Sequence, residues 1–189
     1  MLAGGKSLRL GRDKALEQIG GQRLIERVIE RLSRLGDDII VVTASKNQLP
    51  DLGVRQVHDC YPGRGALVGI YTGVKEATSS HNLVVACDMP FLRCEPIAFL
   101  LGQLTVEDAV IPCWDDDIEP LHAVYATALR PRMGEALRCG LRSVREFLPQ
   151  ISVRYVPEAV MREVRGAEES LRNVNTPEEA ARFAVHVHS

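Results

Sequence analysis

The stretch Leu2–Ala15, LAGGKSLRLGRDKA, determines how the rest of the chain is interpreted. It places Gly4, Gly5 and Gly11 among several Lys and Arg residues. Because glycine has no Cβ, backbone N–H groups of such a loop can approach an anion closely, while the cationic side chains neutralise its charge from outside. The stretch therefore indicates a loop that holds a polyphosphate. The alternative is an exposed basic turn, because short motifs of this composition also arise by chance.

Two common phosphate-binding motifs do not fit the stretch. Gly5-Lys6-Ser7 looks like the end of G-x-x-x-x-G-K-[ST], but the first glycine of that motif would fall before Met1, and Gly11 interrupts the helix that should follow. The dinucleotide fingerprint G-x-G-x-x-G cannot be drawn either, because Gly4 and Gly5 are adjacent.

Length and composition narrow the class of protein. The chain has 189 residues, which fit one domain, and a formal net charge of −2, which gives no support for a nucleic-acid or membrane surface. Five cysteines without a C-x-x-C pair are typical of reduced thiols in the cytosol. No apolar run approaches the ~20 residues that span a bilayer, and no signal peptide is recognisable. We expect a cytoplasmic protein with a single domain, 1–189, and no nucleic-acid or membrane partner.

Strand and helix patterns alternate over the first two-thirds of the chain. Short apolar runs rich in β-branched residues predict strands at 39–42, 54–58, 83–87 and 109–113. Gly20-Gly21 predicts a turn, and helical spacing of apolar residues predicts helices at 22–36, 65–77 and 96–104. This alternation predicts a three-layer α/β/α, Rossmann-like fold with a mostly parallel sheet.

The last third has a different pattern. Asp115–Asp117 separates two strand patterns, which predicts a hairpin-like connection and a small antiparallel component. Ser143–Glu146 reads as a capping box, and Thr176–Glu179 as a second one. Helices are expected at 132–138, from Phe147 and at 177–185, with a strand at 152–156. The sequence assigns no structure to 157–172.

The beginning of the chain leaves two alternatives open. Only Met1-Leu2-Ala3 precede the glycine-rich loop, which leaves little to occupy the centre of a sheet. Either the first strand is very short, or the numbered chain begins a few residues late.

Two aspartates follow predicted strands. In parallel α/β sheets ligands bind outside the carboxyl ends of the strands, where Asp59, Asp88 and the glycine-rich loop all fall. A carboxylate at the tip of a buried strand is costly unless it meets a cation, so Asp88 is the candidate ligand for Mg²⁺. The alternative for both residues is a turn-forming role beside Pro90 and Pro62.

The loop resembles the signature of the nucleotidyltransferases related to molybdenum cofactor guanylyltransferase, L-A-G-G-x-S-x-R-[ML]-G-x-D-K, at every fixed position. The resemblance continues along the chain at Asp59, Pro62-Gly63, Cys87–Pro90, Pro120–Tyr125 and Asn173–Pro177. It implies a nucleotide-diphospho-sugar-transferase-like fold, in which about 1–105 bind the nucleotide and about 106–189 bind the acceptor.

The resemblance also implies roles for individual residues. Arg9 and Lys14 would hold the triphosphate and act with Asp88 in catalysis; their alternative is ordinary surface charge. Asp59 would contact the nucleotide ribose or the metal. Base and first phosphates would be held by backbone groups of four consecutive residues, Leu2, Ala3, Gly4 and Gly5, and the paired glycines favour guanine.

The acceptor site is predicted from several weaker signals. Asn173 and Asn175 match the N-x-N-T-P motif of the family and would position the acceptor. Arg142 and Arg145 flank a helix start that could bind an anion, although an exposed amphipathic helix explains them equally well. His122 is a further candidate contact, but its alternating strand pattern also fits a packed histidine.

The expected activity is the Mg²⁺-dependent transfer of GMP from GTP to molybdenum-molybdopterin, with release of pyrophosphate. Proteins that deliver the cofactor and molybdoenzymes that accept it are the expected protein partners. Two alternatives stay open: a related enzyme that uses CTP or another phosphorylated acceptor, and a carrier that binds nucleotide or cofactor without catalysis.

Overall fold

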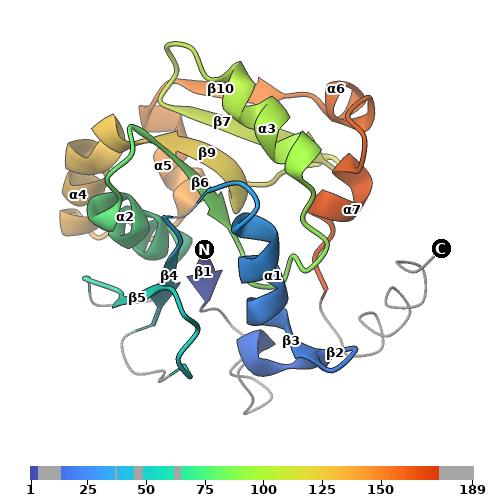
Figure 1. Cartoon of the computed structure of the whole chain (residues 1–189). Coiled ribbons are helices and arrows are strands. Elements are labelled where there is room, and N and C mark those ends of the chain that lie inside the picture. Colours follow the sequence, from blue (N-terminus) through green and yellow to red (C-terminus); the bar gives the residue numbers. More distant parts are fainter. Residues whose placement is uncertain (4–13, 37, 45–48, 62–64, 175–189) are drawn as a thin grey trace.

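One mixed β-sheet forms the centre of the fold in the computed structural model, which describes residues 1–3, 14–36, 38–44, 49–61 and 65–174 (Figure 1). The sheet consists of two parts, with strand orders β1-β4-β5 and β10-β7-β9-β6. A parallel bridge between Leu2 and Ala86 joins β1 to the end of β6. The strands are β1 (Leu2–Ala3), β4 (Ile40–Thr43), β5 (Arg55–His58), β6 (His81–Val85), β7 (Ala109–Trp114), β9 (His122–Ala126) and β10 (Val153–Val156).

The strand directions confirm the predicted mostly parallel sheet with an antiparallel component. β1 pairs with β4, β4 with β5, and β10 with β7 in parallel, whereas β9 runs antiparallel to both β6 and β7. A short strand, β8 (Asp117–Ile118), folds back on β7 through Asp115 and Asp116, whose φ angles are 50° and 60°. A two-residue hairpin turn needs positive φ at both positions, which Asp tolerates better than most residues.

Helices cover both faces of the sheet (Figure 1). Side chains alternate between the faces: Ile40 and Val42 of β4 join the core beneath α2 and α4, whereas Val41 joins the core beneath α1. Helices α2, α4 and α5 therefore form one outer layer, and α1, α3, α6 and α7 form the other. Their bounds are α1 Leu24–Leu32, α2 Ala66–Glu76, α3 Cys94–Gln103, α4 Arg130–Arg138, α5 Val144–Phe147, α6 Glu158–Arg162 and α7 Ala167–Leu171.

Most predicted elements are present, with shifted ends. The first helix begins at Leu24 because Gln22–Arg23 forms a strand, β3, that pairs with β2 (Gln18–Ile19) across the predicted Gly20-Gly21 turn. Short 3-10 helices occupy Lys14–Leu16, Thr127–Leu129 and Leu148–Gln150.

The predicted capping box at Ser143 was wrong. Helix α5 begins directly after Ser143, but the serine side chain makes no capping hydrogen bond within the described residues, and the helix has only four residues. The stretch 157–172, to which the sequence assigned nothing, contains α6 and α7. The helix expected at 177–185, with its capping box, lies outside the described residues. Among the described helices, none has the length and apolar character needed to cross a membrane.

Candidate active site

The carboxyl ends of four neighbouring parallel strands form the candidate site. Asp59 directly follows β5, and its N–H donates to the carbonyl of Thr43 at the end of β4 (2.9 Å). The glycine-rich loop leaves β1 after Ala3, and Asp88 lies three residues beyond β6. The structure therefore places the start of the loop and both aspartates at one edge, as predicted. Gly4, Gly5, Arg9 and Asn175 lie outside the described residues, and only the backbone of Lys14 is described.

Asp59 and Asp88 follow strands that are not neighbours in the sheet. Strands β4 and β1 stand between β5 and β6, so the two strand ends are three inter-strand spacings apart, or about 14 Å. The Oδ1 atom of Asp59 is buried and accepts no hydrogen bond from a described residue. Burial raises the pKa of the Asp59 carboxyl to about 6, although His58 opposes the shift. Of the two roles open to Asp59, contact with the ribose fits this spacing better than metal binding.

Asp88 is held by backbone contacts with segments distant in the sequence. The N–H of Val174 donates to the Asp88 carbonyl (2.9 Å), and the N–H of Cys87 donates to the Leu2 carbonyl (3.1 Å). The first bond brings Asn173, which directly precedes Val174, to the end of β6. A predicted acceptor residue and the predicted metal ligand thus meet at the edge where the phosphate loop begins.

Glu119 is a carboxylate with a strongly shifted pKa that sequence reasoning did not single out. It lies between β8 and β9, where its N–H donates to the Pro112 carbonyl (2.9 Å) and its own carbonyl accepts from the N–H of His122 (3.0 Å). Burial raises the pKa of the Glu119 carboxyl to about 7, and the negative charges of Asp117 and Asp88 add to the shift. Glu119 therefore brings a second carboxylate into the electrostatic environment of Asp88. Its only sequence signal is that it directly precedes the Pro120–Tyr125 segment.

The two candidate arginines bind different parts of the fold. Arg145 donates from Nη1 and Nη2 to the carboxylate of Asp117 (2.6 and 2.8 Å), and Arg145 lowers the pKa of that carboxyl by hydrogen bonding. Arg142 donates from Nη1 to the carbonyls of Leu137, in the last turn of α4, and of Leu141, after its end (2.8 Å each). The guanidinium groups thus stabilise a turn and a helix end, and these contacts do not form the single anion-binding corner that was predicted.

His122 is completely buried at the start of β9, opposite Val85 of β6. Neither ring nitrogen has a hydrogen-bond partner among the described residues. Burial lowers the pKa of the imidazole from 6.5 to about 4, because the charged form would lose its hydration. The structure thus shows the packed histidine of the two alternatives, with a side chain that does not reach the surface of the site.

The burial of His122 predicts that the free energy of unfolding decreases at acidic pH. Between pH 7.5 and 4.5 the unfolded chain takes up a proton at this histidine while the folded chain largely does not, so the free energy of unfolding should fall by about 2–3 kcal/mol on its account. We expect His122→Leu to lose correspondingly less stability over this interval, as measured by urea unfolding at both pH values. The raised pKa values of Asp59 and Glu119 act in the opposite direction, but they cancel when the two proteins are compared. Exposed His81 supplies the control: His81→Gln should keep the pH dependence of the parent, and equal pH dependence in all three proteins would contradict the assignment.

Comparison with known proteins gives a consistent result. The chain matches the family described as "MobA-like NTP transferase domain" over residues 1–154. A probable molybdenum cofactor guanylyltransferase from Thermococcus gammatolerans is 36% identical over 192 residues, covering 97% of this chain and 96% of the relative. A protein of the same description from Pelotomaculum thermopropionicum is 34% identical over 185 residues, covering 98% and 90%.

Solved structures agree with this result. The molybdopterin-guanine dinucleotide biosynthesis protein A from Archaeoglobus fulgidus superposes with a TM-score of 0.79 at 27% identity, covering 99% of this chain and 96% of that one. The 2-C-methyl-D-erythritol 4-phosphate cytidylyltransferase from Thermus thermophilus shares the fold, with a TM-score of 0.70 at 16% identity over 100% and 98% of the two chains. Since the family match spans most of the chain and relatives above 30% identity span nearly all of it, the chain belongs to the MobA-like NTP transferase domain family.

Proposed function

We propose that the protein is a guanylyltransferase that transfers GMP from GTP to molybdenum-molybdopterin and releases pyrophosphate. Its relatives of 34% and 36% identity carry the name molybdenum cofactor guanylyltransferase. The structural observation that supports the proposal most strongly is the Val174–Asp88 hydrogen bond of 2.9 Å, which brings Asn173 to the tip of β6. Nucleotide and acceptor must meet at one place for direct transfer, and this bond joins the segments proposed to bind each of them.

The chemistry requires an acceptor phosphate oxygen to attack the α-phosphorus of GTP, in line with departing pyrophosphate. No covalent enzyme intermediate is needed, so the protein contributes positioning and charge neutralisation. In the proposal, the backbone of Leu2–Gly5 holds the base and first phosphates, Arg9 and Lys14 neutralise the triphosphate, and Asp59 contacts the ribose. Asn173 and Asn175 position the acceptor.

Mg²⁺ is the proposed metal, and Asp88 its proposed ligand. Mg²⁺ prefers oxygen ligands and usually binds through one or two carboxylates together with substrate phosphates. Asp88 supplies such oxygens at the edge where the loop begins, whereas no cluster of three or more His, Cys, Asp or Glu able to hold a metal occurs among the described residues. This donor set fits an ion that completes its coordination with phosphate oxygens. Bound there, the ion would stabilise the negative charge that develops on the phosphoryl group.

The proposal also covers the cellular location and the partner proteins. A cytoplasmic location fits the expected reduced cysteines, and cofactor-delivery proteins and acceptor molybdoenzymes are the proposed partners. Enzymes that use CTP share the fold, as the cytidylyltransferase from Thermus thermophilus shows, so nucleotide choice has to be tested directly.

The test is pyrophosphate release by the purified protein with Mg²⁺ and each of GTP, CTP, ATP and UTP, with and without molybdenum-loaded molybdopterin. We expect release only with GTP and the pterin together, and loss of release when Mg²⁺ is removed with EDTA. Preference for CTP would contradict the guanylyl assignment. Binding of GTP without any release, when the pterin is present, would support the carrier alternative.

A further inference from the structure

The order of the strands divides the carboxyl edge of the sheet into two sides. The main strands lie in the order β5-β4-β1-β6-β9-β7-β10. The glycine-rich loop leaves β1 and Asp59 follows β5, so the proposed nucleotide site takes the side of β5, β4 and β1. Asp88 lies beyond the end of β6, next to this side. An acceptor that meets the nucleotide at Asp88 therefore binds on the other side, where β7 ends and β9 begins.

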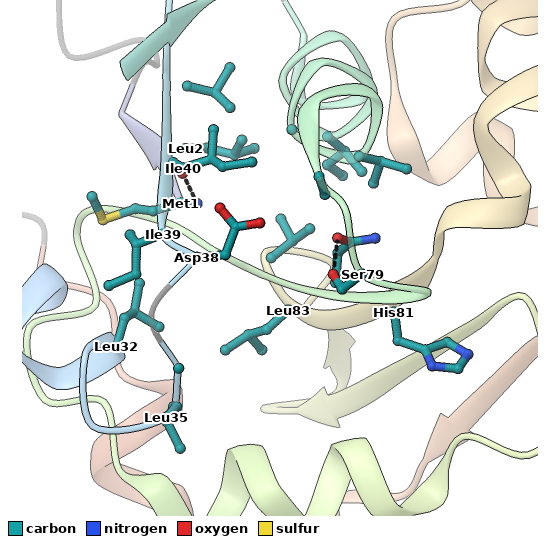
Figure 2. A pocket seen from close by; sticks show the side chains of 18 of the residues that line it. Met1, Leu2, Leu32, Leu35, Asp38, Ile39, Ile40, Ser79, His81 and Leu83 are labelled. Atoms are coloured by element: carbon teal, nitrogen blue, oxygen red, sulfur yellow. Dashed lines mark hydrogen bonds between the residues drawn. The ribbon is translucent and has the colours of Figure 1, made fainter. Parts of the chain in front are cut away.

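A pocket of about 390 Å³ lies at the opposite edge of the sheet, where β4 and β6 begin (Figure 2). Apolar side chains such as Leu35, Ile39 and Leu83 line most of it, and none of its described lining residues is Lys or Arg. Such a lining gives a phosphorylated molecule no Lys or Arg side chain to bind. Asp88 lies beyond the other end of β6, so this pocket does not serve as the acceptor site.

Glu119 stands at the beginning of the acceptor side. β9 runs antiparallel to β6, so it begins at the edge where β6 ends. Beyond their last paired residues the N–H of Ala86 donates to the Leu121 carbonyl (3.1 Å), which keeps the two chains side by side. Asp88 and Glu119 each lie two residues beyond this contact. The two carboxylates therefore belong to neighbouring chains at the same edge, and Glu119 is the one farther from the nucleotide side.

Hydrogen bonds hold the backbone around Glu119. Both its N–H and its carbonyl are bonded to neighbouring backbone groups (2.9 and 3.0 Å). Directly before it, β8 is fastened to α5, because Arg145 donates to the Asp117 carboxylate and to the Ile118 carbonyl (3.1 Å). The Glu119 side chain thus projects from a fixed part of the chain, which suits a residue that orients a substrate.

The Glu119 carboxyl group lies where its negative charge is costly. The side chain is half-buried, and burial together with the charges of Asp117 and Asp88 raises its pKa to about 7. Arg145 opposes this shift only in part, since its guanidinium binds Asp117. Among the residues that the structure describes, no Lys or Arg forms an ion pair with Glu119. A carboxylate in this position is thus available to a ligand that donates hydrogen bonds.

We propose that Glu119 selects and orients the acceptor by accepting hydrogen bonds from two adjacent N–H groups at the end opposite the acceptor phosphate. The inference deepens the proposed function and rests on it. A pterin ring carries a ring N–H beside an amino group, and a carboxylate can accept one bond from each with its two oxygens. The same carboxylate repels a phosphate, so the phosphate is directed toward Asp88 and the ring edge toward Glu119. Acceptors without paired N–H groups should bind poorly.

Steady-state pyrophosphate release tests this role in the parent, in Glu119→Gln and, as control, in Glu163→Gln, which alters an exposed glutamate after α6. Glutamine keeps the shape of the side chain but replaces one accepting oxygen with a donor. We expect the KM for molybdenum-molybdopterin to rise about 10–100-fold in Glu119→Gln, the effect of losing a charged hydrogen bond, while the KM for GTP stays unchanged. Glu163→Gln should keep both constants.

Thermal unfolding separates this role from a structural one. A carboxyl group with a raised pKa destabilises the folded state above that pKa, because the folded chain holds its charge at a cost. Glu119→Gln removes this charge, so its thermal midpoint at pH 8 should equal or exceed that of the parent. A residue that served only to stabilise the fold would give a lower midpoint.

A binding measurement tests the inference without catalysis. The probes are hydroxymethylpterin and hydroxymethyl-lumazine, two fluorescent rings that differ at one position, where the lumazine has a carbonyl in place of the amino group. We expect the parent to bind the pterin at least about tenfold more tightly than the lumazine, and Glu119→Gln to bind the two alike.

An unchanged KM for the acceptor in Glu119→Gln, or an equal rise in Glu163→Gln, would overturn the inference. So would a lower thermal midpoint in Glu119→Gln, or a parent that does not prefer the pterin to the lumazine. If the parent prefers the pterin through Glu119 but releases no pyrophosphate, the proposed function fails and the recognition of the ring stands.

Discussion

Asp88→Asn should lower the rate of pyrophosphate release with GTP and molybdenum-molybdopterin by about 10²–10³-fold, the effect of removing one electrostatic stabiliser from a transition state. Asparagine keeps the shape of the side chain and removes its charge. The contact that docks Val174 uses the backbone carbonyl of residue 88, so the substitution leaves that bond available. We therefore expect the loss to fall on turnover and on the Mg²⁺ concentration required, with a thermal midpoint close to that of the parent.

Asp116→Asn is the matched control for this prediction. Asp116 is exposed in the β7–β8 turn, with a φ of 60° that asparagine tolerates well. The control should keep parental turnover and an unchanged requirement for Mg²⁺. If Asp88→Asn retained a third or more of parental turnover, the assignment of Asp88 as the metal ligand would have to be abandoned.

Gly65→Ala should destabilise the fold by about 1–3 kcal/mol or more, the usual cost of forcing an extra carbon into a packed site. A Cβ at this position would stand 2.3 Å from the carbonyl oxygen of Arg142 and 2.9 Å from its Cβ. The Arg142 carbonyl also accepts the N–H of Leu67 in the first turn of α2 (3.2 Å), so it cannot move away without losing that bond. To relieve the clash, the start of α2 has to move away from the segment that joins α4 to α5.

Thermal unfolding provides the measurement for Gly65→Ala. At about 2–4 °C per kcal/mol for a chain of this size, the midpoint should fall by roughly 2–12 °C. Gly102→Ala is the control, because a Cβ at Gly102 of α3 meets nothing within 4 Å and alanine is the better helix former by about 1 kcal/mol. Its midpoint should stay the same or rise. A Gly65→Ala midpoint within error of the parent would mean that the close approach to Arg142 is absent in solution.

The central strands could be predicted because burial of a strand on both faces produces a run of consecutive apolar residues in the sequence. Val84 and Val85 are buried on opposite faces of β6, and a segment buried on both faces is apolar at consecutive positions. Helices α6 and α7 have five residues each, too few for a helical period to emerge, so the stretch 157–172 gave no pattern. The β2–β3 hairpin was predicted only as a turn, since two-residue strands carry no alternation of their own.

Site residues that follow a strand could be predicted from the sequence. A residue in the connection between two strands could not. Asp59 and Asp88 each follow a predicted strand, and the convergence of parallel strands then brings them to one edge. Glu119 lies in the connection between β8 and β9, and its relation to Asp88 arises only because β9 inserts beside β6. The Val174–Asp88 contact joins residues far apart in sequence, and no local pattern signals it.

The position of β9 also affects the order in which the chain can fold. β6 and β7 are consecutive long strands in sequence, yet β9, made later, lies between them and pairs with both. While the ribosome has delivered only residues 1–121, β6 exposes one edge and β7 has nothing to join it to β6. Contacts of this long range form slowly and leave unpaired edges exposed in the meantime. The free edge of β6 is therefore paired only after β9 has emerged, so the sheet is completed late in synthesis.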